Sequence, residues 1–144
     1  MSTRNVSICV FYDKKTKNIL IQERDKNSKV GEGYGFWGGG IEEGETKEQA
    51  LYRELKEELN YKPDIIQYLY NTSIKVHRDG LYKDCVLNID VFISPITNEL
   101  RKCKVYEGKD KVEINIEKAL ELKERFLEHD DKILMKVREE ILQY

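Results

Sequence analysis

Runs of apolar residues along the chain predict the strands of a sheet. Val6–Tyr12 and Asn18–Gln22 are short apolar runs separated by the polar DKKTK, which predicts two strands joined by a turn. Asp64–His77 and Tyr82–Ile96 are rich in Ile, Val, Tyr and Leu, and the intervening RDG predicts a turn between them. Lys111–Ile116 predicts one more short strand.

The segment Lys47–Leu59 is predicted to be a helix with clear limits at both ends. It is full of good helix formers, and Thr46 to Gln49 forms a capping box of the S/T-x-x-E/Q type. Asn60 stands where helices commonly end in a left-handed residue, and Pro63 prevents continuation.

Two further helices and the order of all elements define the expected fold class. Ile116–Phe126 and Asp130–Leu142 carry apolar residues at helical spacing. The resulting order β-β-loop-α-β-β-β-α-α predicts an α/β (α+β) fold, and 144 residues predict a single domain over residues 1–144. The order differs from the regular β-α-β-α alternation of a doubly wound dinucleotide-binding fold.

Glycine is concentrated in one segment. Seven of the chain's nine glycines lie between Gly31 and Gly44, which predicts a loop where the backbone turns sharply or approaches something closely. GYGFWG at residues 33–38 satisfies G-x-G-x-x-G, the dinucleotide-binding fingerprint. That fingerprint requires a helix directly after the glycines. The expected helix starts only after Thr46, so an NAD-binding oxidoreductase is disfavoured.

Composition narrows the expected partners and location. A net charge of −2 gives no electrostatic case for a nucleic-acid partner, whereas a small phosphorylated substrate is compatible through a bound divalent cation. Cys9, Cys85 and Cys103 form no C-x-x-C pair, which favours a reducing compartment over disulfides or zinc. MSTRNVSICVFYDKK holds no apolar run long enough for a signal peptide or membrane span. We therefore expect a cytoplasmic protein without a membrane partner.

Three glutamates share one face of the predicted helix. Glu54, Glu57 and Glu58 are i, i+3 and i+4 neighbours, whose like charges repel each other. A hard divalent cation such as Mg²⁺, which prefers oxygen ligands, would stabilise such a cluster. A solvated acidic helix face is the alternative for this short motif taken alone.

The residues around these carboxylates follow a longer pattern, G-x5-E-x7-R-E-U-x-E-E-x-G-U, where U is bulky and apolar. The pattern begins at Gly39, includes Glu45 and Arg53, and ends at Tyr61, with Asn60 in place of the last glycine. This is the Nudix box, so the chain resembles the Nudix hydrolases of the MutT-like size class. The resemblance implies an α/β/α sandwich with a mixed β-sheet, in agreement with the order of elements above.

The resemblance also implies a chemistry and a set of site residues. Nudix hydrolases cleave a pyrophosphate bond in a nucleoside diphosphate-linked substrate by attack of a water activated by Mg²⁺ (or Mn²⁺). Glu57 and Glu58 correspond to metal ligands, and the carbonyl of Gly38 or Gly39 to a backbone ligand. Glu54 corresponds either to a metal ligand or to the general base, and both roles stay open.

Two more residues are expected to contribute to catalysis. Arg53 is expected to hold Glu54 or Glu45 by a charge-assisted hydrogen bond. Many relatives take a further acid from a loop ahead of a late strand, and Glu107 is our candidate for it. An ordinary surface glutamate is the alternative for Glu107.

Candidates for substrate contact lie near the glycines and at a strand end. Phe36 and Trp37 are candidates for stacking on a base, or they pin the Gly-rich segment to the core. Gly39 is expected close to the metal and the phosphates. His77, near the end of a predicted strand, is a further candidate for substrate contact.

Nucleoside triphosphates, including damaged or deoxy forms, are the first expected substrates. Dinucleoside polyphosphates and nucleotide sugars are the second, because specificity in this family lies outside the box. A non-catalytic nucleotide-binding domain is the alternative from another class, and the complete set of acidic residues disfavours it. A homodimer is compatible with the resemblance, because relatives frequently form one.

Overall fold

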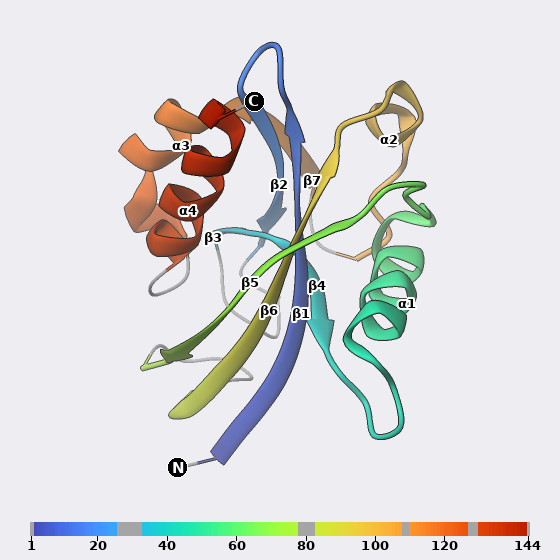
Figure 1. Cartoon of the computed structure of the whole chain (residues 1–144), viewed down its shortest axis with the longest axis vertical. Helices are drawn as coiled ribbons and strands as arrows, with labels where there is room; N and C mark the ends of the chain where they lie inside the picture. Colours follow the sequence, from blue (N-terminus) through green and yellow to red (C-terminus); the bar gives the residue numbers. More distant parts are fainter. Residues whose placement is uncertain (1, 26–32, 78–82, 108–109, 127–129, 144) are drawn as a thin grey trace.

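A seven-stranded mixed sheet forms the centre of the computed structural model, and helices cover both of its faces (Figure 1). The structure describes residues 2–25, 33–77, 83–107, 110–126 and 130–143. The strands are β1 Ser2–Asp13, β2 Asn18–Arg24, β3 Gly33–Gly35, β4 Trp37–Gly40, β5 Gln67–Lys75, β6 Cys85–Pro95 and β7 Asp110–Asn115. The helices are α1 Lys47–Leu59, α2 Asn98–Lys102, α3 Ile116–Glu121 and α4 Asp130–Gln143, with a 3-10 turn at Lys123–Arg125.

Strand β1 organises the sheet because it pairs along both of its edges. It runs parallel to β6, from Ser2 opposite Cys85 to Tyr12 opposite Pro95. On the other edge, its C-terminal end pairs antiparallel with β2 and its middle pairs antiparallel with β4. Strand β2 extends the sheet to β3 and β7, and β6 extends it to β5. The Gly-rich β4 thereby lies directly beside the middle of β1.

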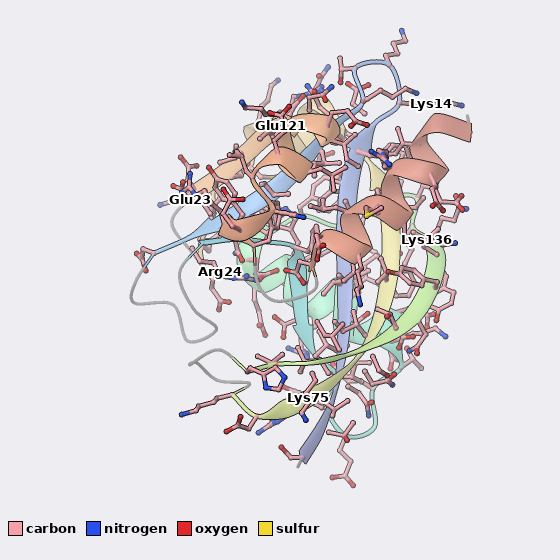
Figure 2. The ribbon with its side chains drawn as sticks, turned by 90° about the vertical axis from the view of Figure 1, so that its left-hand side faces the viewer. Lys14, Glu23, Arg24, Lys75, Glu121 and Lys136 are labelled. Carbon is pink, nitrogen blue, oxygen red and sulfur yellow. The ribbon has the colours of Figure 1, made fainter. Side chains whose placement is uncertain are left out.

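Alternation along β1 divides the core into two layers. Val6, Ile8 and Val10 point to one face and pack under α3 and α4, the side of the molecule that Figure 2 shows. Cys9 and Phe11 point to the other face, which α1 and α2 cover. A mixed sheet between two helical layers is the α/β/α sandwich expected from the sequence, so the predicted fold class is confirmed.

The predicted strands correspond closely to the observed ones. Strands β1 and β2 contain the first two predicted segments, and β7 falls on the last of them. The predicted segments Asp64–His77 and Tyr82–Ile96 contain β5 and β6, which pair antiparallel as a hairpin does. The predicted turn at residues 78–80 and Tyr82 itself lie outside the described residues.

The Gly-rich segment differs from the predicted loop. From Gly33 onward it holds two short strands, β3 and β4, whose backbones pair with β2 and β1. Glycine is depleted in strands, so composition alone indicated a loop here. The G-x-G-x-x-G stretch therefore lies on strands and does not form a strand-to-helix turn. This arrangement excludes the dinucleotide-binding interpretation of these glycines.

Two helical segments also differ from the prediction. The sequence did not predict α2, a short helix whose first turn is capped by Thr97 Oγ1, 3.0 Å from the donating N–H of Leu100. The predicted helix Ile116–Phe126 ends as α3 at Glu121, and the chain continues through the 3-10 turn. None of the helices in the described segments has the length and apolar character needed to cross a membrane.

Helix α1 has the limits that its sequence predicts. Thr46 Oγ1 accepts from the N–H of Gln49 at 3.1 Å, and Gln49 Oε1 accepts from the N–H of Thr46 at 2.9 Å. At the other end, Asn60 is left-handed, with φ 50° and ψ 42°, and its N–H bonds to the carbonyl of Lys56 at 2.9 Å. Both ends of α1 are therefore fixed by local interactions.

The left-handed end of α1 is testable by substitution at Asn60. We expect Asn60→Ala to lower the free energy of unfolding by about 1 kcal/mol, because a side chain with Cβ and no local hydrogen bond is disfavoured there. Asn60→Gly, the matched control, should be at least as stable as the wild type. Urea unfolding measures both. Equal stability of the alanine and glycine variants would contradict this account.

Candidate functional site

Packing of α1 on the sheet determines where its carboxylates point. Leu51, Leu55 and Leu59 are buried against the core layer of β1. Because these leucines occupy one side of the helix, Glu54 and Glu57 lie on another, and Glu57 is exposed while Glu54 is partly buried. The helix thus presents an acidic face beside β4.

The backbone of β4 approaches this acidic face closely. A Cβ at Gly39 would lie 2.6 Å from the carboxyl carbon of Glu54, closer than any real side chain tolerates. Gly38 has φ +131°, and a Cβ there would lie 2.1 Å from the carbonyl oxygen of Ser7. Glycine is therefore required at Gly38, by conformation and by the close backbone, whereas a side chain at Gly39 would displace the carboxyl group of Glu54.

Arg53 holds the acidic residues together. Its Nε and Nη2 donate to both carboxylate oxygens of Glu45, at 2.7 and 3.0 Å. Its Nη1 donates to Glu54 Oε1 at 2.9 Å and lies 3.5 Å from Glu57 Oε1. Nη2 also donates to the carbonyl of Gly40 at 2.8 Å. The sequence predicted a bond to Glu54 or Glu45, and the structure shows both.

These contacts change the proton affinity of the partners. The hydrogen bond from Arg53 lowers the pKa of Glu45 below its usual value. The bonds to Glu45 and Glu54 raise the pKa of Arg53 further above an already high value. Burial raises the pKa of Glu54, and the bond from Arg53 opposes that effect. Arg53 therefore favours the charged carboxylate at both positions.

A carboxylate from a distant loop joins the acidic face. One oxygen each of Glu54, Glu57 and Glu107 lies within 4.8 Å of the others. Glu107 belongs to the segment between α2 and β7, and the N–H of Tyr106 donates to the carbonyl of Glu58 at 2.8 Å. This backbone bond ties the loop to the end of α1. The structure thus places Glu107 where the sequence analysis proposed a further acid.

Glu58 has a different environment from its neighbours on α1. It is only 5% exposed, and its Oε1 accepts from the N–H of Gly38 at 2.9 Å. Burial raises its pKa to about 8, and the negative charges of Glu54 and Glu107 act in the same direction. The hydrogen bond from Gly38 and the charge of Arg24 (labelled in Figure 2) oppose them. Glu58 lies outside the group of three oxygens. The bond from Gly38 occupies one oxygen of the Glu58 carboxylate, and the metal-ligand role expected for Glu58 stays a prediction.

The group of three oxygens fits a hard divalent cation. Carboxylate oxygens are the ligands that Mg²⁺ and Mn²⁺ prefer, and oxygens around one Mg²⁺ ion lie about 3–4 Å apart at metal–oxygen distances of about 2.1 Å. The three oxygens lie within 4.8 Å of one another, close enough to share one ion. Glu54, Glu57 and Glu107 are therefore the residues that could hold such an ion.

The aromatic residues of the Gly-rich segment lie in the core. Trp37 is fully buried, and its Nε1 donates to the carbonyl of Leu20 at 2.9 Å. Phe36 is 4% exposed, and its ring centroid lies 5.9 Å from that of Phe126. Neither ring has a face open to a base. Of the two roles considered for Phe36 and Trp37, the structure supports packing of the Gly-rich segment on the core and not stacking on a base.

His77 is not brought to the carboxylates. It follows β5 at the end of the sheet where Ser2 pairs with Cys85, whereas Gly39 pairs with Ser7. Five residues of extended strand between these two pairs correspond to about 16 Å. His77 thus lies at another part of the sheet from the acidic face.

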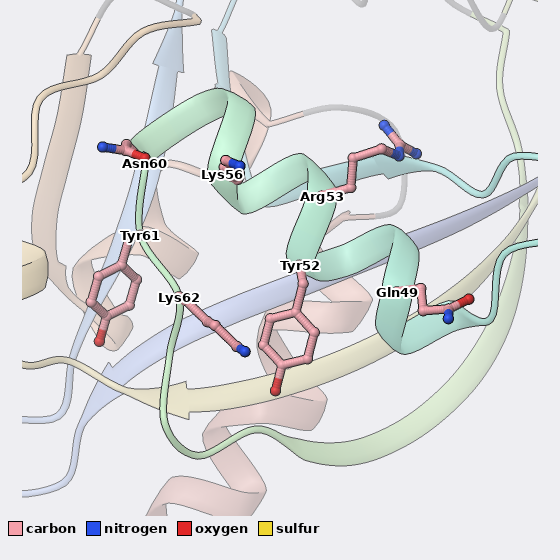
Figure 3. A pocket seen from close by; sticks show the side chains of 7 residues that line it. All are labelled: Gln49, Tyr52, Arg53, Lys56, Asn60, Tyr61 and Lys62. Carbon is pink, nitrogen blue, oxygen red and sulfur yellow. The ribbon is translucent and has the colours of Figure 1, made fainter.

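A depression that the sequence did not predict lies on the outer side of α1 (Figure 3). It has a volume of about 490 Å³, and Lys62 Nζ lies 5.4 Å from the centroid of the Tyr52 ring within it. The lining residues are Gln49, Tyr52, Arg53, Lys56, Asn60, Tyr61 and Lys62. Among them, Arg53 is the residue that also bonds to Glu45 and Glu54. Gln49, Tyr52, Arg53 and Lys56 are spaced so that they share one face of a helix, and this spacing is the feature of the sequence that could have indicated the depression. The depression does not contain the carboxylates.

The match to known proteins assigns the family. The NUDIX domain model matches residues 1–137, so the chain belongs to the Nudix family. An 8-oxo-dGTP diphosphatase of Proteus vulgaris is 48% identical over 48 residues, which cover 31% of this chain and 40% of that protein. An RNA pyrophosphohydrolase of Shewanella loihica is 53% identical over 34 residues, which cover 24% of this chain and 20% of that protein.

Coverage limits what these relatives show. The first curated relatives are matched over a fifth or less of their own length. The solved structure of a MutT protein from Methanosarcina mazei Go1 superimposes with a TM-score of 0.78 over 96% of this chain and 95% of that one. At 15% identity this likeness shows the fold alone.

The buried Glu58 makes stability depend on pH. A carboxyl group whose pKa rises from 4.5 to about 8 on folding stabilises the folded state at low pH, and this contribution is lost as the pH rises between those values. With chelator present, we expect the free energy of unfolding to fall by a few kcal/mol from pH 5 to pH 8.

Glu58→Gln should remove most of that slope, because its amide oxygen still accepts from Gly38 and carries no charge. The matched control, Glu43→Gln at an exposed position of the same loop-and-helix region, should keep the wild-type slope. Urea unfolding at several pH values measures both. An unchanged slope in Glu58→Gln would show that the burial of Glu58 does not control it.

Proposed function

We propose that the chain hydrolyses a pyrophosphate bond in a nucleoside diphosphate-linked substrate, with Mg²⁺ or Mn²⁺ as cofactor. The observation that carries this proposal is the convergence of Glu54, Glu57 and Glu107, from two separate parts of the chain, within 4.8 Å. Family membership supports it, because relatives are named as pyrophosphohydrolase and diphosphatase.

Each residue of the site has a proposed role. Glu54, Glu57 and Glu107 would hold the cation, with Glu58 as a further proposed ligand. The bound cation would supply charge neutralisation and a water of lowered pKa. Glu54 or Glu107 would accept a proton from the attacking water, and the choice between them is open. Arg53 fixes the carboxylate of Glu54, and the carbonyl of Gly38 or its neighbour Gly39 is a further proposed ligand.

A nucleoside triphosphate, in its deoxy or an oxidised form, is the proposed substrate. The Proteus relative is named for such a substrate, and its match covers a larger share of this chain than that of the Shewanella protein. Dinucleoside polyphosphates, nucleotide sugars and the triphosphate end of an RNA are the alternatives. A regulatory domain without turnover is disfavoured, because every acidic position of the box is present.

We keep a reducing, cytoplasmic location as part of the proposal. The three cysteines are free, and two of them, Cys9 and Cys85, are buried. Free thiols are typical of proteins in reducing compartments. A homodimer remains part of the proposal from the family resemblance alone.

A substrate panel tests the proposed reaction. We expect Mg²⁺-dependent release of pyrophosphate from at least one of dGTP, 8-oxo-dGTP and the other nucleoside triphosphates. The panel also contains a dinucleoside polyphosphate, a nucleotide sugar and a 5′-triphosphorylated RNA. Hydrolysis of one of these instead would redirect the substrate assignment. Binding of nucleotides without any turnover, in either metal, would favour the regulatory domain.

Substitutions in the acidic group test the metal assignment. Glu57→Gln and Glu107→Gln should each lower kcat/KM by about 100-fold or more, because the amide is a poor ligand for a divalent cation. The exposed Glu43→Gln serves as the control and should keep wild-type kinetics. Full activity in Glu57→Gln would contradict the proposed site.

A further inference from the structure

Strand β2 carries one buried polar side chain among apolar ones. Gln22 is 3% exposed and follows Leu20, Ile19 and Ile21, which are fully or almost fully buried. Because side chains alternate along a strand, Gln22 shares the face of Leu20, which is the face covered by α1. A buried amide that displaces an apolar residue calls for a hydrogen-bond partner.

The partner of Gln22 is the backbone of Glu107. Gln22 Nε2 donates to the carbonyl oxygen of Glu107 at 2.9 Å, although the two residues are 85 positions apart. On the preceding residue, the N–H of Tyr106 donates to the carbonyl of Glu58. The backbone on both sides of the Glu107 Cα is thus held, once by β2 and once by the end of α1.

A further contact links the two ends of the segment that contains Glu107. Lys111 Nζ donates to the carbonyl of Cys103, which joins the two ends of the stretch that contains Glu107. Leu100 on α2 is fully buried and anchors the beginning of that stretch in the core. Gln22 thus contacts Glu107, whose carboxylate forms an acidic group with those of Glu54 and Glu57.

Repulsion within the acidic group explains why such a tie is needed. The oxygens of Glu54, Glu57 and Glu107 lie within 4.8 Å of each other, and like charges at this distance repel. Glu107 is exposed and comes from a loop, so it is the member that can retreat most easily. A fixed backbone limits how far its carboxylate can move away.

We propose that Gln22 is a positioning residue, which holds the backbone of Glu107 so that its carboxylate reaches the cation-binding group. This inference rests on the proposed function, because it assumes that Glu54, Glu57 and Glu107 bind the cation. Gln22 itself touches neither the cation nor the substrate in this scheme. It acts from β2 through one hydrogen bond.

A double-mutant cycle on Mn²⁺ affinity tests the inference without a substrate. Gln22→Met keeps the length of the side chain and removes the donor. Free Mn²⁺ is measured by electron paramagnetic resonance during titration of the full chain. We expect the Kd to rise about tenfold in Gln22→Met, as for other residues that orient metal ligands. In the Glu107→Gln background, the same change should leave the Kd unaltered.

Two further variants guard against a general loss of structure. Gln22→Asn keeps an amide but is one methylene too short to reach Glu107, so it should raise the Kd as Gln22→Met does. Ser94→Ala is the matched control: Ser94 is buried and donates to the carbonyl of Ile65 at 2.6 Å, away from the acidic group. Its Kd for Mn²⁺ should stay at the wild-type value.

The outcomes separate this inference from the proposed function. An equal rise of the Kd with and without the Glu107 carboxylate, or no rise at all, would overturn the positioning role and leave the hydrolase proposal intact. A wild-type chain that binds no Mn²⁺ would overturn both. Coupling between Gln22 and Glu107 in a chain that hydrolyses no nucleotide would support the positioning role and contradict the proposed reaction.

Faster exchange of the Tyr106 amide proton in Gln22→Met, measured by NMR in the absence of metal, would give independent support. This proton is bonded to the carbonyl of Glu58, so its protection reports how firmly the loop is held on α1. Unchanged protection would show that Gln22 does not hold the loop.

Discussion

The close approach of α1 to the backbone of β4 is the constraint on which the acidic site depends. At Gly39 the Glu54 carboxyl group occupies the space where any other residue would have its Cβ. The approach brings negative charges together. Two donors offset them: Arg53 bonds to Glu54, and the N–H of Gly38 bonds to Glu58. The guanidinium groups of Arg53 and Arg24 cannot neutralise all of these carboxylates, so the remaining charge favours either a bound cation or a proton.

Local interactions explain why α1 and the motif on it were predictable. The capping box at Thr46 and the left-handed Asn60 are set by residues within one turn of the helix, so the sequence alone fixes both limits. The spacing of Glu54, Glu57 and Glu58 follows from the helical repeat. Strands β1 and β6 were equally predictable from their long apolar runs, because strands buried on both faces need continuous apolar sequence.

Features that depend on tertiary contacts were not predictable in the same way. Strands β3 and β4 form from glycines because β1 and β2 offer edges for pairing, and that overrides the low strand propensity of glycine. The burial of Trp37 and the different environment of Glu58 arise from the same pairing. Glu107 was a candidate from its place in a loop ahead of a late strand, and the tertiary contacts of its backbone with α1 and β2 bring it to the acidic face.

The parallel pairing of β1 with β6 has a consequence for how the chain is made. Ser2 faces Cys85, so β1 must wait for its parallel partner until more than 80 further residues, up to β6, have been synthesised. Helix α1 can form early from its own local signals, but its acidic face has no complete counterpart until the segment before β7 arrives. Contacts between residues far apart in the sequence form slowly relative to a helix. Cation binding at this site would therefore report that α1 and the segment before β7 have come together.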